Sequence, residues 1–74
     1  MEKEPKFVVC IENKSYPASL EFGKIYRVLE DKKAAQHQML RIIDESGEDY
    51  LYSEKFFVDI KLPQIAEDAF MALA

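Results

Sequence analysis

The stretch MLRIIDESGEDYLYS, residues 39–53, predicts a β-hairpin at the centre of the fold. Four of its first five residues are apolar and include two adjacent β-branched isoleucines, and residues 49–52 alternate polar or aromatic side chains with aliphatic ones. The intervening DESGE has the composition of a turn, in which Gly47 can adopt a positive φ. We expect Leu51 to point into the core, which would send Tyr50 and Tyr52 to the opposite face.

The segments around this hairpin predict more strands. They are residues 6–11 (KFVVCI), 25–30 (IYRVLE) and 57–62 (FVDIKL). The first is continuously apolar, as expected of a strand that is covered on both faces. Residues 12–24 predict a long loop, which Tyr16, Leu20 and Phe22 would hold against the sheet.

The remaining segments are shorter or helical in pattern. Residues 31–38, DKKAAQHQ, are polar, and we expect a surface loop there rather than a helical turn; residues 54–56 allow only a turn or a 3₁₀ turn. After Pro63, apolar residues recur at helical spacing, and they are Ile65, Ala66, Ala69, Phe70 and Leu73. Residues 63–74 therefore predict a short amphipathic helix that packs on the strands.

These elements predict a mainly β fold in a single domain of 74 residues. We expect a flexible N-terminal tail at residues 1–5, a small five-stranded barrel at 6–62 and the packed C-terminal helix at 63–74. The order is strand, long loop, strand, short loop, strand, tight turn, strand, 3₁₀ turn and strand.

Composition narrows the class of protein. Fourteen acidic residues against ten basic ones give a net charge of -4, which disfavours binding to a phosphate backbone. The chain has one cysteine, a charged start (MEKEPK) and no apolar run of the roughly 20 residues that span a membrane. We therefore expect a cytoplasmic protein without a signal peptide, either a monomer or a weak dimer.

No motif for catalysis, a cofactor or a metal stands out. Asp44, Glu45, Glu48 and Asp49 lack the spacing of a twelve-residue calcium loop, so we interpret them as a solvated hairpin tip in which Asp44 bonds turn amides. The lone Cys10 lies in an apolar run, where burial makes a thiol inert. The lone histidine lies in a polar loop, and no glycine-rich phosphate loop exists. We expect no cofactor and no enzymatic activity.

The order of elements resembles the Src-homology-3 barrel. Residues 19–30, SLEFGKIYRVLE, are similar to that family's entry from its first long loop into the second strand, and Tyr50–Ser53 with Phe56 and Phe57 are similar to its fourth strand, 3₁₀ turn and fifth strand. Peptide-binding members carry a groove tryptophan near the position of Met39 and Leu40 here, and this chain has no tryptophan.

The chain also resembles a group of small bacterial and phage proteins with no assigned activity. The shared residues are Cys10, Ile11, Asn13, Tyr16, Ser19, Leu20, Gly23, Lys24, Tyr26, Val28 and the run 43–50.

Aromatic side chains are the strongest functional signal. Tyr16, Tyr50, Tyr52 and Phe56 would form an apolar patch with polar tips and an acidic rim of Glu48, Asp49 and Glu54, unless the C-terminal helix or the long loop covers them. Such a patch suits an unidentified protein partner whose own surface is apolar with basic residues around it. The function expected is thus a protein–protein interaction module; the alternative is a nucleic-acid-associated barrel.

Overall fold

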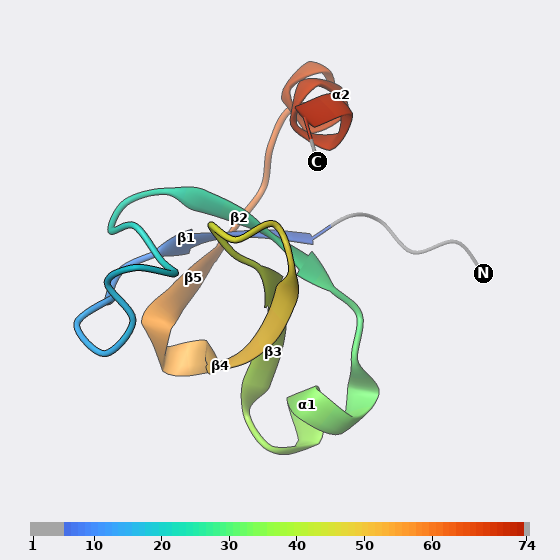
Figure 1. Ribbon diagram of the computed structural model, residues 1–74. Coiled ribbons are helices and arrows are strands. Elements are labelled where there is room, and N and C mark those ends of the chain that lie inside the picture. The colour runs from blue at the N-terminus through green and yellow to red at the C-terminus, as the bar shows by residue number, and fades with distance from the viewer. Residues whose placement is uncertain (1–5, 74) are drawn as a thin grey trace.

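The computed structural model describes residues 6–73 and has five β-strands, two α-helices and one 3₁₀ helix there (Figure 1). In chain order they are β1 (Lys6–Cys10), β2 (Ile25–Leu29), α1 (Lys32–Gln36), β3 (Met39–Ile43), β4 (Asp49–Ser53), η1 (Glu54–Phe56), β5 (Phe57–Ile60) and α2 (Gln64–Leu73). The tail expected at residues 1–5 lies outside the described residues.

The strands form one antiparallel sheet in the order β4-β3-β2-β1-β5. Strands β1 to β4 pair consecutively, and β5 returns across the molecule to pair with β1. The outermost strands, β4 and β5, share no pairing within residues 6–73, so the sheet is open. The mainly β class, the five strands and the C-terminal helix are confirmed, whereas closure into a barrel is not.

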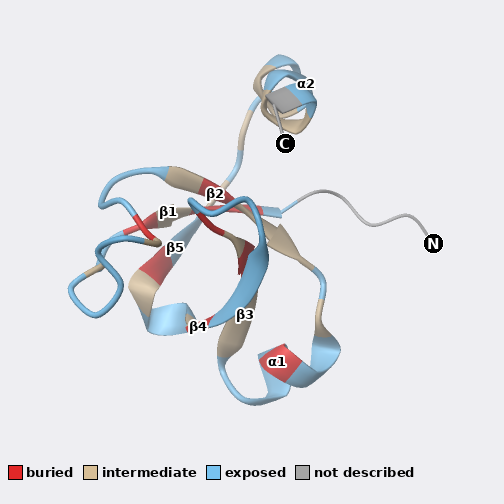
Figure 2. Cartoon of the chain, in the orientation of Figure 1, coloured by how far each residue is buried: buried red, intermediate tan, exposed pale blue. Residues whose placement is uncertain are grey.

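One face of the sheet, here called the inner face, holds the core. Its buried side chains are Val8, Cys10, Leu20, Tyr26, Ile42, Tyr52 and Phe57. Leu20 comes from the long loop, whose fold is held by hydrogen bonds such as that from the Asn13 side chain to the Leu20 carbonyl. The loop was expected to be held by Phe22 as well, but Phe22 is 67% exposed. Figure 2 shows that most buried residues lie on the strands and that most of the loop residues are exposed; Leu20 in the long loop and Asp44 in the hairpin turn are buried exceptions.

The predicted β3–β4 hairpin forms, but it lies at one edge of the sheet rather than at its centre, and the orientation of β4 also differs from the prediction. Gly47 has a φ of +84°, as the turn requires. The β3–β4 register places Leu40 opposite Tyr52 and Arg41 opposite Leu51. Tyr52 therefore points into the core and Leu51 is exposed, so the expected orientation of β4 is wrong. Tyr52 can occupy the core because its hydroxyl bonds the buried Asp44 carboxylate. Since neighbouring side chains of a strand point to opposite faces, an inward Tyr52 requires an outward Leu51.

The prediction of a loop at residues 31–38 is also wrong, because residues 32–36 form the helix α1. Asp31 caps this helix by accepting a hydrogen bond from the Ala34 amide at 3.0 Å. Ala34 is buried, and the alanines, lysines and glutamine of α1 are good helix formers. The helix ends at Gln36, and Gln38, the residue after the His37 cap, has a left-handed φ of +56°.

The opposite, outer face of the sheet is partly covered by α2. Phe7 points to this face and is buried, and its ring meets Phe70 of α2 edge-on at a centroid distance of 5.1 Å. Strand β1 is thus covered on both faces, as its continuous apolar run predicted. Within the expected apolar stripe of α2, however, Ile65 is 81% exposed. Of that stripe, Ala66 and Phe70 are half-buried and lie one helical turn apart. With these two side chains facing the sheet, Ile65 points away from it.

Candidate functional site

Three aromatic rings meet where the long loop passes over η1 and the end of β4. The Tyr16 ring lies edge-on to Tyr52 at 5.0 Å and is tilted against Phe56 at 5.9 Å. Backbone hydrogen bonds from the Tyr16 amide to the Asn13 carbonyl and from the Leu20 amide to the Tyr16 carbonyl shape the loop around this ring. Phe56 is held by η1, which Ser53 caps by accepting from the Lys55 amide.

The four predicted site residues occupy different positions in this arrangement. Tyr52 is only 3% exposed and forms the base of the cluster, so it cannot touch a partner directly. Tyr16 is 43% exposed and Phe56 is half-buried, so these two rings offer the accessible surface. Tyr50 is exposed two residues before Tyr52, but it makes no ring contact with the other aromatics of residues 6–73.

The structure adds to the predicted aromatic patch one residue that was not expected from sequence, and it removes one residue from the predicted acidic rim. Ile11 is exposed, and its amide donates to the Phe56 carbonyl at 2.8 Å, which places the Ile11 backbone beside that of Phe56. Its place at the end of an apolar run was the available signal. Asp49 was expected at the rim, but it binds Arg41 at 2.8 Å and lies on the opposite face of β4 from Tyr50. We define the aromatic surface as Ile11, Tyr16 and Phe56.

Beneath this surface, the hairpin turn supplies a buried carboxylate. Asp44 accepts hydrogen bonds from the Tyr52 hydroxyl at 2.6 Å and from the Ser46 amide at 2.9 Å, which confirms its predicted role in bonding turn amides. Burial raises the pKa of Asp44, but the hydrogen bonds from Ser46 and Tyr52 outweigh it and hold that pKa below its usual value. Burial and the adjacent carboxylate raise the pKa of Tyr52 to about 12.

A second tyrosine–carboxylate pair links the long loop to the same turn. The Tyr26 hydroxyl donates to Glu45 and accepts from the Glu21 amide, while the Lys24 ammonium lies 2.7 Å from the Glu45 carboxylate. Lys24 and Tyr26 together hold the pKa of the Glu45 carboxyl below its usual value. Both pairs explain why acidic residues gather at this turn: they fasten it to the core and to the loop. Among the described residues, no cluster of three or more potential metal ligands is present.

The one cysteine and the one histidine lie in different environments. Cys10 is fully buried, its thiol donates to the Glu12 carbonyl at 3.3 Å, and burial raises the pKa of this thiol. His37 is exposed at the C-terminal cap of α1. The arrangement therefore does not provide the hydrogen-bonded thiol–imidazole pair that a cysteine nucleophile needs.

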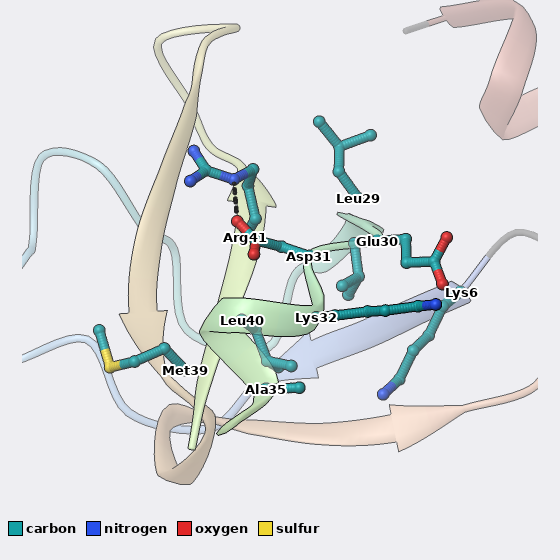
Figure 3. A pocket seen from close by; sticks show the side chains of 10 residues that line it. Lys6, Leu29, Glu30, Asp31, Lys32, Ala35, Met39, Leu40 and Arg41 are labelled. Atoms are coloured by element: carbon teal, nitrogen blue, oxygen red, sulfur yellow. Dashed lines mark hydrogen bonds and ion pairs between the residues drawn. The ribbon is translucent and has the colours of Figure 1, made fainter. Parts of the chain in front are cut away.

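A groove of about 290 Å³ opens between α1 and the neighbouring ends of β2 and β3 (Figure 3). Its apolar lining includes Val28, Ala35 and Leu40, and charged side chains stand around it. Arg41 and Asp31 form an ion pair at 2.8 Å at one side of the groove. Because this pair neutralises itself, the groove carries no strong preference for the charge of a ligand.

Comparisons with protein-family models, with curated proteins and with solved structures find no match to this chain. No helix within residues 6–73 is long and apolar enough to cross a membrane.

Proposed function

We propose that this chain is a non-enzymatic protein-interaction module that binds a partner through the aromatic surface. The observation that carries this proposal is the accessible Tyr16–Phe56 ring pair, which rests on a buried Tyr52. Rings held rigidly from below lose little side-chain entropy on binding, and tyrosine combines apolar area with a polar tip. Both features favour reversible contact with another protein.

We also propose that the fold is a variant of the Src-homology-3 barrel. The support is the return of β5 to β1, together with a long first loop, the β3–β4 hairpin and a 3₁₀ turn before β5. Peptide-binding members of that family use a groove of aromatic side chains, and Tyr16 and Phe56 are an accessible aromatic pair here. With Met39 near the position of the groove tryptophan, we propose a ligand that is not proline-rich.

The ligand we propose is an apolar peptide segment. Glu12 and Lys14 follow Ile11 in the sequence, and Glu54 and Lys55 precede Phe56, so charges of both signs flank the aromatic surface along the chain. Apolar burial, rather than the basic partner rim expected from sequence, should then dominate the affinity. The rival, a nucleic-acid role, is weakened because Lys24 and Arg41 are engaged by carboxylates of the same chain.

The test is selection of a random peptide library on the whole chain, followed by affinity measurement on matched variants. Tyr16→Ser should weaken the selected peptides tenfold or more, about 1.4 kcal/mol, at a temperature where circular dichroism shows that the variant is folded. Phe22→Ser is the control, because Phe22 is an exposed ring of the same loop that makes no ring contact within residues 6–73. Tyr52→Ala is unsuitable, since Tyr52 is a core residue.

Two results would contradict the proposal. One is equal peptide affinity in the Tyr16→Ser and wild-type chains. The other is the absence of any selected peptide together with retention on heparin that falls steeply with salt, which would favour the nucleic-acid role.

A further inference from the structure

A second concave site lies on the outer face of the sheet, away from the aromatic surface. It is a groove of about 400 Å³ between α2 and the hairpin turn. Its apolar lining includes Ile25 of β2, Ile43 of β3 and Phe70 of α2, and Arg27 of β2 stands among them. This volume falls within the range of about 300–1,000 Å³ found for small-molecule pockets.

Arg27 is the unusual residue of this groove. It occupies the middle of the central strand β2, directly opposite Phe7, and its side chain is half-buried. Three other cations of the described residues are paired with carboxylates: Lys6 with Asp59, Lys24 with Glu45, and Arg41 with Asp31 and Asp49. The Arg27 side chain makes no hydrogen bond or ion pair with any residue from 6 to 73. A partly desolvated guanidinium without an anion is unfavourable, and no carboxylate of residues 6–73 is bonded to this one.

The two acidic residues that line this groove, Asp44 and Glu45, have other partners. Glu45 is neutralised by Lys24 at 2.7 Å and bonded by the Tyr26 hydroxyl. Asp44 is buried and directs its carboxylate toward Tyr52 and Ser46. An anion that enters the groove therefore meets the free donors of Arg27 without an opposing free carboxylate from this turn.

We propose that this groove binds a small molecule with a carboxylate on an apolar body. The carboxylate would pair with the Arg27 guanidinium, whose planar fork of donors matches two carboxylate oxygens. The body would lie over Ile25 and Ile43 and against the ring of Phe70. The groove under α1 is a weaker candidate, because its Lys32 is exposed and already solvated while Glu30 and Asp31 line the same space.

The experiment is a titration of the ¹⁵N-labelled chain with octanoate, followed by amide chemical shifts, and octanol serves as the uncharged control. We expect saturable octanoate binding with a Kd of about 1 mM, with shifts centred on Ile25, Arg27, Ile43 and Phe70. Arg27→Met keeps the length of an apolar stem and removes the charge, so it should weaken octanoate at least tenfold. Lys33→Met removes an equal charge on the exposed face of α1 and should leave the affinity unchanged.

Three results would overturn the inference: no saturable shift, equal affinity in the Arg27→Met chain, or shifts centred on the α1 groove. Octanol that binds as tightly as octanoate would also exclude the Arg27–carboxylate pair. Tyr16→Ser should bind octanoate like the wild type, so this test is independent of the proposed protein-binding surface.

Discussion

Removing a single hydroxyl, with Tyr52→Phe, tests how the core and the hairpin turn are fastened together. The Tyr52 ring stays in place, but the Asp44 carboxylate loses the 2.6 Å hydrogen bond from the Tyr52 hydroxyl. It keeps the hydrogen bonds from the amide and hydroxyl of Ser46. A buried hydrogen bond to a charged acceptor contributes about 1.5–3 kcal/mol. We therefore expect the free energy of unfolding to fall by about 2 kcal/mol, a large share of the roughly 4–11 kcal/mol typical of a chain of this length.

The assay is urea unfolding followed by circular dichroism, with thermal melting as a second measure. In a domain of this size, about 2 kcal/mol corresponds to a fall in Tm of roughly 8–16 °C. Tyr50→Phe is the matched control, because the Tyr50 side chain is 53% exposed and its hydroxyl makes no hydrogen bond within residues 6–73. A loss in Tyr52→Phe no larger than in this control would refute the reasoning.

The same pair of chains should show a characteristic dependence on pH. The pKa of Asp44 is lower in the folded chain than its ordinary value of 3.8. Its carboxylate therefore stabilises the fold above that value, and the contribution is lost as pH falls through the folded pKa. Because Tyr52 contributes to the lowering, the difference between wild type and Tyr52→Phe should be constant from about pH 5 to 8 and shrink below about pH 4.

Gly47→Val should lower the free energy of unfolding by about 1–2 kcal/mol in urea titrations, because Gly47 has a φ of +84°. Space is free around a Cβ there, so the cost is one of backbone conformation, and Gly47→Asn should cost less; equal losses would contradict this cause. Phe70→Ala should cost about 1–2 kcal/mol and expose Phe7, whereas Ile65→Ala, at a site 81% exposed, should change stability by less than about 0.5 kcal/mol. Equal effects of these two on the melting temperature would show that α2 does not dock through Phe70.

Much of the candidate site was visible in the sequence, but its exposure was not. Tyr16 and Phe56 were predicted as partner-binding residues and they do present accessible rings. Tyr52 was predicted with them, yet it is buried because its hydroxyl is satisfied by Asp44, a partner eight residues away across the hairpin. Neither Ile11 nor Arg27 was predicted as a binding residue, because the role of each depends on neighbours in other segments.

The local patterns of the chain were enough to place the five strands, the turn at Gly47 and the C-terminal helix. These features depend on side-chain alternation, backbone freedom and helical spacing over a few residues, which are properties of adjacent positions. Alternation defines two faces of β4, but it cannot say which one meets the core. That choice depends on the β3–β4 register and on a buried acceptor for Tyr52, so Leu51 rather than Tyr52 faces outward.

Long-range packing decided the rest. Pairing of β5 with β1 joins segments about fifty residues apart, which no local pattern encodes. Residues 31–38 look polar enough for a loop, but burial of Ala34 and the Asp31 cap make part of them helical. The groove around Arg27 exists only because Phe70 of α2 is brought beside Ile25 and Ile43. Surfaces assembled from distant segments follow from the tertiary structure, since burial and charge pairing there depend on contacts between residues far apart in the chain.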